Sequence, residues 1–191
     1  MELAARKTIS LRGKILGNGK PLLCIPIVSS GEISLYNEVK KVVDLSPDVI
    51  EWRADYFDDI TDFYKTKKVL DMIRLSAGEI PIIFTCRSYI EGGFKEIEDN
   101  IKFKLIKEII RSGKIDAVDI ELSSGRENIA YIKSIAQKNN VALILSYHNL
   151  QETPPAEVLV EKIRQEILNG ADIAKVSVMA NTVEDVLKLL T

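Results

Sequence analysis

The stretch Gly170-Ala171-Asp172-Ile173-Ala174-Lys175-Val176-Ser177-Val178-Met179 predicts a short buried β-strand with a lysine in its middle. Side chains alternate along a strand, so Lys175 shares a face with Ser177 and points away from Val176 and Val178. Burial of an ammonium group is costly and lowers the lysine pKa, which favours the neutral, nucleophilic amine. The alternative is an exposed strand with a solvated Lys175. The apolar run favours the buried interpretation and makes Lys175 a candidate nucleophile.

The rest of the chain alternates apolar strands with amphipathic helices, and strand starts recur at about the length of a βα unit. Strands are predicted at residues 22–28, 48–54, 81–87, 117–122, 141–148 and 172–179. Helices are predicted at 34–45, 61–76, 96–112, 128–138, 155–169 and 181–190, the last with Asn181 as N-cap and Glu184 completing a capping box. Two short strands at 8–12 and 14–16, followed by a turn at 17–19, precede this series. We therefore expect one α/β domain over residues 1–191 with a parallel sheet.

Composition is that of an ordinary globular chain of 191 residues, with 46% hydrophobic residues, a formal net charge of −2 and a mean hydropathy of +0.04. Dispersed basic residues argue against nucleic-acid binding, and no apolar run approaches the roughly 20 residues of a membrane span. No signal-peptide core precedes Lys20, so we expect a cytoplasmic protein. Cys24 and Cys86 lie in apolar runs and are predicted to be buried free thiols rather than a disulfide.

Polar side chains recur on one face of the predicted strands, toward their carboxyl ends. These residues are Glu51 with Arg53, Asp119 with Glu121, Ser146 with His148, Lys175 with Ser177, and Arg87 at the end of its strand. A doubly wound sheet would be apolar on both faces and would carry a glycine-rich first loop, which is missing here. A barrel explains the pattern, because its outer face packs on helices and its inner strand ends form the site.

The number of βα units raises a question about completeness. An eight-unit barrel needs roughly 250 residues, whereas this sequence supplies six units and stops within the sixth helix. We therefore expect either a truncated (β/α)8 barrel with an N-terminal β-hairpin or a smaller open sheet.

Several ordered motifs resemble those of type I 3-dehydroquinate dehydratases, from about Lys20 to Thr191. The segments are Glu51-Trp52-Arg53-Ala54-Asp55, Phe84-Thr85-Cys86-Arg87 with Glu91-Gly92-Gly93, Asp119-Ile120-Glu121-Leu122, Ser146-Tyr147-His148 with Thr153-Pro154, and Gly170 to Lys175. The resemblance implies a TIM-barrel lyase of the shikimate pathway, which makes aromatic amino acid precursors. It implies dehydration of 3-dehydroquinate through a lysine imine, without metal or organic cofactor. We expect a homodimer.

The resemblance also implies roles for single residues. Lys175 matches the lysine that forms the Schiff base, His148 the general acid and base, and Glu91 the carboxylate that supports the histidine. Residues matching or neighbouring the substrate contacts are Glu51, Trp52, Arg53, Arg87 and Met179. Asp119, Glu121 and Ser146 are expected behind these groups, where the carboxylates would balance the buried cations.

Two departures from the family pattern bear on activity. Pro26 stands where some relatives have a substrate-contacting Ser. The later arginine that clamps the substrate carboxylate, and the loop serine and glutamine that close over it, have no counterpart in this sequence. We therefore expect this chain to aggregate, oligomerise or rely on a missing C-terminal piece, and to turn over 3-dehydroquinate poorly if at all. Two alternatives remain open: a class I aldolase-like Schiff-base enzyme, and a barrel piece that associates through its edges without catalysis.

Overall fold

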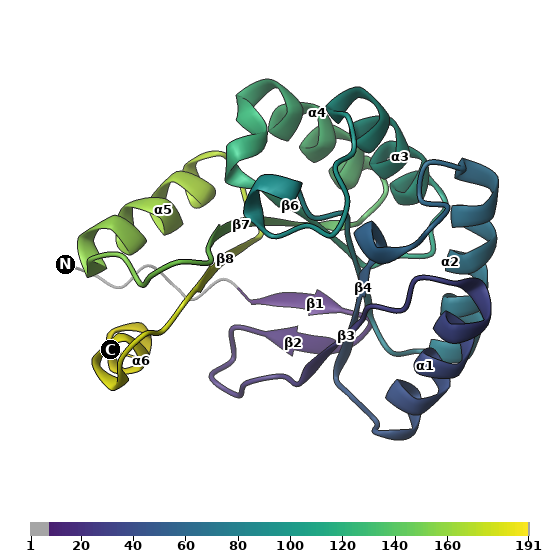
Figure 1. Cartoon of the computed structure of the whole chain (residues 1–191), viewed down its shortest axis with the longest axis horizontal. Coiled ribbons are helices and arrows are strands. Elements are labelled where there is room, and N and C mark those ends of the chain that lie inside the picture. The colour runs from purple at the N-terminus through teal and green to yellow at the C-terminus, as the bar shows by residue number, and fades with distance from the viewer. Residues whose placement is uncertain (1–7, 191) are drawn as a thin grey trace.

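A curled sheet of six parallel strands dominates the computed structural model, which describes residues 8–190 (Figure 1). The strands are β3 (Cys24–Ile27), β4 (Val49–Arg53), β5 (Ile82–Thr85), β6 (Ala117–Glu121), β7 (Ala142–Asn149) and β8 (Ile173–Val178). They lie side by side in chain order. A doubly wound sheet reverses its strand order at a switch point, whereas an unbroken order is the arrangement of a barrel. The predicted parallel α/β barrel architecture is confirmed, as an open half-barrel.

Helices follow the strands and cover the convex side of the sheet (Figure 1). They are α1 (Glu32–Asp44), α2 (Phe63–Ala77), α3 (Asp99–Arg111), α4 (Gly125–Lys138), α5 (Ala156–Leu168) and α6 (Val183–Leu190). The core lies between this layer and the outward side chains of the strands, among them Ile50, Phe84, Val118 and Leu145, all fully buried. Burial of these apolar surfaces stabilises the curvature of the sheet.

Short 3-10 turns follow three strands and place polar groups at their carboxyl ends. They are η1 (Ala54–Tyr56), η2 (Tyr89–Glu91) and η3 (Leu122–Ser124). Because neighbouring parallel strands end at the same edge of the sheet, these turns lie beside one another and can bond to one another's side chains.

An antiparallel hairpin of β1 (Ile9–Leu11) and β2 (Lys14–Leu16) lies on the concave side of the sheet (Figure 1). Its tight turn is Arg12–Gly13, both with positive φ, and the 17–19 segment follows β2. Leu11 packs against Ala117 and Ile144 on the inner face of the strands. The hairpin thereby covers the inner face away from the carboxyl ends.

Strand β8 differs from the expected buried strand, because it is an edge strand and has a neighbour on one side only. Ser177 is exposed, the other residues of β8 are half-buried rather than buried, and the Lys175 side chain is 36% exposed. Cys24, on the opposite edge strand, is exposed, which corrects the prediction of two buried thiols; Cys86 is buried and both are free. Apolar sequence alone did not reveal that these strands form the sheet edges.

The start of α6 corrects a second prediction. The helix begins at Val183, and Thr182 caps it: Thr182 Oγ1 accepts from the Asp185 amide at 3.2 Å, and Asp185 Oδ2 accepts from the Thr182 amide at 3.1 Å. This is the capping box expected one residue earlier, with the hydroxyl of Thr182 used in place of the amide of Asn181. Within residues 8–190, no helix is long and apolar enough to cross a membrane.

Candidate active site

Lys175 projects from β8 into a group of carboxylates on the inner face of the sheet. Its Nζ lies 2.9 Å from Asp119 Oδ2 and 3.4 Å from Glu51 Oε1. Burial lowers the lysine pKa, but the charges of Asp119 and Glu51 outweigh it and raise the Lys175 pKa above its ordinary value. This corrects the expectation that burial alone would leave a neutral amine. The geometry instead stabilises a cation at this position.

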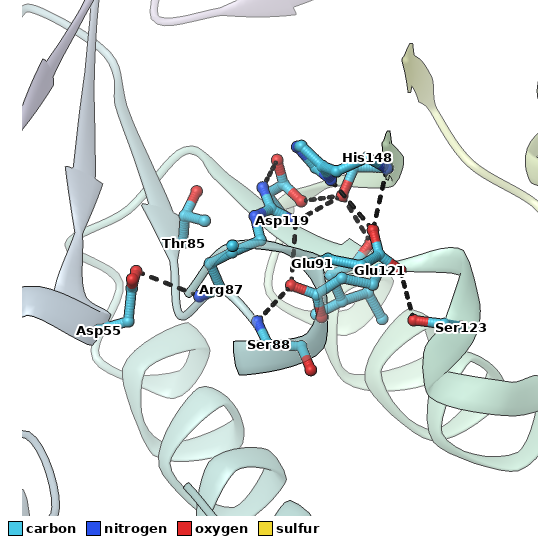
Figure 2. A network of polar contacts seen from close by, with 12 residues as sticks. Asp55, Thr85, Arg87, Ser88, Glu91, Asp119, Glu121, Ser123 and His148 are labelled. Carbon is cyan, nitrogen blue, oxygen red and sulfur yellow. Dashed lines mark hydrogen bonds and ion pairs between the residues drawn. The ribbon is translucent and has the colours of Figure 1, made fainter. Parts of the chain in front are cut away.

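Arg87, just after β5, bonds to side chains near the carboxyl ends of β6 and β7, and Figure 2 shows it beside Asp119 and Glu121. Its Nη2 donates to Asp119 Oδ2 at 2.9 Å, and its Nη1 donates to Glu121 Oε1 at 2.9 Å and to Ser146 Oγ at 2.7 Å. The arginine is only 3% exposed. Protein groups therefore engage this guanidinium at both of its terminal nitrogens.

Asp119 connects the arginine and the lysine. It is fully buried and accepts from Ser146 Oγ at 2.6 Å in addition to the two cations. Burial raises a carboxyl pKa, but Arg87 and Lys175 more than offset this and hold the Asp119 pKa below its usual range. Asp119 was expected behind the site, yet it touches the candidate nucleophile directly. Ser146 pairs in register with Lys175, and its hydroxyl donates to Asp119.

Glu121 belongs to the same network through a residue that the sequence did not identify. Lys102, on α3, is 3% exposed, and its Nζ donates to Glu121 Oε2 at 2.6 Å. Buried charges of this kind require partners, and Glu121 serves both Lys102 and Arg87. The signal in the sequence was a lysine on the apolar face of a helix, between Ile101 and Phe103, and it was too weak to interpret alone.

His148 and Glu91 form a pair beside the cluster (Figure 2). Glu91 Oε2 lies 3.1 Å from His148 Nδ1 and accepts the His148 amide at 3.0 Å, while Glu91 Oε1 accepts from Ser123 Oγ at 2.5 Å. Burial raises the Glu91 pKa, but these hydrogen bonds lower it below its ordinary value. An ionised Glu91 assigns the proton to Nδ1 and leaves Nε2 as the proton acceptor. Ser123 is a second residue that the sequence did not identify.

The strand register brings His148 and Lys175 to the same face of neighbouring strands. Lys175 pairs with Ser146 and His148 pairs with Ser177. Two residues along a strand separate the pairs, which corresponds to roughly 7 Å. A small molecule bound covalently at Lys175 is therefore within range of the imidazole.

Glu51 and Arg53 complete the inner face on β4. Glu51 Oε1 accepts from Thr85 Oγ1 at 2.7 Å. Arg53 is held by a fully buried aspartate, Asp55, through its Nε at 3.0 Å and its Nη2 at 2.9 Å. The Arg53 side chain remains 20% exposed. Both residues are therefore placed where small-molecule hydroxyls could be bound.

Three further predictions concern the surroundings of the site. Trp52 is fully buried on the helix-facing side of β4 and packs edge-on against Phe84 at 5.5 Å, so the prediction of a substrate contact is wrong. Alternation along β4 forces this placement, since Glu51 and Arg53 occupy the inner face. Met179 is 45% exposed just after β8. Pro26 pairs in register with Glu51, on the inner face of β3.

Among residues 8–190, no group of three or more histidine, cysteine or acidic side chains is arranged to hold a metal ion.

Comparison with known proteins places this arrangement in a family. The family model described as Type I 3-dehydroquinase matches residues 23–191. A 3-dehydroquinate dehydratase of Clostridium novyi (strain NT) is 40% identical over 184 residues, which is 96% of this chain and 73% of the relative.

Solved structures agree with this match. The 3-dehydroquinate dehydratase from Geobacillus kaustophilus HTA426 superimposes with a TM-score of 0.93 at 40% identity, over 96% of this chain and 72% of that one. The type I enzyme from Clostridium difficile, solved with covalently modified comenic acid, gives 0.94 at 35% identity, over 98% and 74%.

Proposed function

Because this chain belongs to the type I 3-dehydroquinase family, we propose that it is a hydro-lyase that converts 3-dehydroquinate to 3-dehydroshikimate in the shikimate pathway. The observation that carries the proposal is the placement of Lys175 between Asp119 and Glu51, one strand from the His148–Glu91 pair. A lysine amine can form an imine with a ketone, and a nearby histidine base can then remove a proton from the carbon next to that imine.

The first step is formation of an imine on Lys175. The amine of Lys175 attacks the ketone carbon of the substrate, and loss of water gives a protonated imine. Asp119, 2.9 Å from Nζ, and Glu51 lie beside this positive charge. Because they favour the cation of the free lysine, they also favour the iminium, which withdraws electrons from the adjacent carbon.

The second step moves a proton through His148. Its Nε2 removes a proton from the carbon next to the iminium and leaves an enamine. Glu91 at Nδ1 holds the ring and stabilises the imidazolium that forms. The enamine then expels the hydroxyl on the following carbon, which leaves as water with the proton from His148. Hydrolysis of the imine releases the product and restores Lys175.

Glu51 and Arg53 orient the substrate, and Met179 lies at the rim of the site. Glu51 supplies acceptor oxygens for hydroxyl groups, and Arg53 supplies donors that Asp55 does not fully occupy. Arg87, Glu121 and Ser146 support the position and charge of Asp119. We further propose a single domain, a homodimer and a cytoplasmic location, which fit dispersed charge and exposed apolar side chains on α5 and α6.

Borohydride trapping tests the imine. We expect incubation with 3-dehydroquinate and borohydride to leave a secondary-amine adduct on the peptide that contains Lys175, formed by reduction of the imine of the substrate or of its dehydrated product. Lys175→Met removes the adduct, and Lys162→Met serves as the control, because Lys162 lies against the Tyr147 ring outside the cluster. An adduct on a different lysine contradicts the assignment.

A further inference from the structure

Asp55 is the buried group on which three parts of the site converge. It lies in η1, directly after β4, and is fully buried. Its Oδ1 accepts from Arg53 Nε at 3.0 Å and from the Arg87 amide at 3.2 Å. Its Oδ2 accepts from Arg53 Nη2 at 2.9 Å and from the Phe94 amide at 2.9 Å. The carboxylate thus holds one cation and two backbone amides.

The two amides are the ends of one segment, residues 87–94. The Arg87 amide opens it and the Phe94 amide closes it, and both point at Asp55. Inside the segment, the Gly93 amide donates to the Ser88 carbonyl at 2.9 Å. A Cβ on Gly93 would lie 2.2 Å from the Arg87 carbonyl oxygen, so the segment folds tightly upon itself. Figure 2 shows the Asp55 contact with the Arg87 end.

This segment carries Glu91, the carboxylate that binds His148. It also begins with Arg87, which binds Asp119 beside Lys175. Arg53 Nη2 also donates to the Gly92 carbonyl at 3.3 Å, so the guanidinium helps Asp55 to hold segment 87–94. One side chain therefore connects a candidate substrate ligand with the support of the candidate base.

We propose that Asp55 is a positioning residue of the reaction, which holds segment 87–94 so that Glu91 keeps the proton of His148 on Nδ1 and Arg53 faces the substrate. The catalytic part of this inference depends on the proposed function. The hydrogen-bond partners of Asp55 are Arg53 and the amides of Arg87 and Phe94, so it acts on the site through Arg53 and Glu91. Loss of its charge-assisted bonds leaves two buried amide donors without acceptors and removes the carboxylate partner of the Arg53 guanidinium.

Asp55→Asn is the sharpest test, because it keeps the size of the side chain and replaces one acceptor oxygen with a donor. The matched control is Asp58→Asn, since Asp58 makes an exposed ion pair with Lys95 at 3.2 Å. His148 is the only histidine in the chain, so the ring nitrogen signals of untagged protein in a ¹⁵N NMR spectrum need no further assignment.

We expect the following results. In Asp55→Asn, the neutral imidazole moves from the Nδ1–H tautomer toward the Nε2–H tautomer. Borohydride trapping at Lys175 stays within about threefold of the parent chain while turnover falls by roughly 10²-fold, the scale of a displaced acid–base group. Asp58→Asn matches the parent chain in all three measurements. Gly93→Ala, which displaces the segment from its other side, gives the same tautomer change and is the substitute if Asp55→Asn does not fold.

The inference is overturned if both variants keep the parent tautomer, or if trapping and turnover fall in equal proportion with no tautomer change. The latter result would mean that Asp55 only supports folding. If the parent chain forms no adduct at Lys175, the proposed function fails, and the tautomer measurement still decides whether Asp55 positions Glu91.

Discussion

At the scale of single residues, charge pairing determines what each group in the cluster can do. Lys175 was expected to be activated by burial, but Asp119 and Glu51 raise its pKa. In the proposed mechanism, these two carboxylates stabilise the iminium, and the amine of Lys175 loses a proton before it attacks the ketone. The pair of His148 and Glu91 is the proposed second proton-transfer group.

His148→Ala separates imine formation at Lys175 from proton transfer by His148. Because Lys175, Asp119 and Glu51 are untouched, we expect borohydride trapping at Lys175 to persist, while turnover falls by roughly 10²–10⁴-fold through loss of the acid–base group. Mass spectrometry measures the first quantity and steady-state kinetics the second. Turnover close to that of the parent chain would show that another group removes the proton.

The buried position of Glu166 predicts that the free energy of unfolding depends on pH. This fully buried glutamate of α5 accepts the Lys175 amide at 3.1 Å through Oε2, and its Oε1 has no partner among the described residues. Burial, with a smaller contribution from the charge of Asp119, raises its pKa from 4.5 to about 7. A folded-state pKa above the unfolded value means that the stabilising contribution is complete below pH 4.5 and is lost as pH rises through about 7.

Glu166→Gln should therefore show a larger gain in unfolding free energy, relative to the parent chain, above pH 7 than below pH 4.5. Denaturant melts across this window measure the difference. Glu161→Gln is the control on the same helix, because Glu161 pairs with Arg164 at the surface. A difference between Glu166→Gln and the parent chain that does not change with pH would contradict the raised pKa.

At the scale of elements, the hairpin and the strand edges decide how the sheet is closed. The hairpin β1–β2 covers the inner face with Leu11, which is 3% exposed. Just before β8, the Asp172 amide donates to the Leu143 carbonyl of β7. By alternation, the Lys175 amide points to the open side of β8, where Glu166 accepts it. A helix side chain thereby occupies the place of a neighbouring strand at the lysine.

Leu11→Ala tests the contribution of the hairpin. Removal of the buried side chain should lower the free energy of unfolding by about 2–4 kcal/mol, through lost burial and the cavity it leaves. Ile15→Ala in β2, where the side chain is 45% exposed, should change it far less. Equal losses in the two variants, measured by denaturant unfolding, would show that the hairpin does not pack as described.

At the scale of the whole molecule, the half-barrel exposes apolar side chains near its β8 edge. Leu168 is 77% exposed and Ile167 60% exposed on α5, while Val183 is 71% and Leu190 77% exposed on α6. Exposed apolar side chains on both helices support the proposed homodimer. The proposed homodimer therefore predicts a contact that involves these two helices.

Leu168→Glu should weaken self-association at least tenfold, because it introduces a charge into the predicted contact. Sedimentation velocity over a concentration series measures the dissociation constant. Leu75→Glu is the matched control, since Leu75 is 85% exposed on α2, away from the β8 edge. An unchanged dissociation constant in Leu168→Glu, or equal weakening in both variants, would place the contact elsewhere.

Periodicity alone predicted all six parallel strands and the helices between them, within a few residues at each end. It also placed Lys175, His148 and Glu51 on one face, because alternation is a property of any strand. The same rule argued against Trp52 as a substrate contact, and motif resemblance alone suggested otherwise. Local sequence was sufficient wherever the determining physics was local: side-chain alternation, helical spacing and capping.

Tertiary structure alone decided which charges meet. The Lys102–Glu121, Ser123–Glu91 and Lys175–Asp119 contacts join residues far apart in the chain, and no local pattern encodes their distances. Edge position was likewise invisible in sequence, so the exposure of Cys24 and the half-burial of β8 were not predicted. Electrostatic interactions depend on separation and burial in space. The sequence therefore predicted which residues gather at this site, whereas the direction of the Lys175 pKa shift depends on contacts that form only in the folded chain.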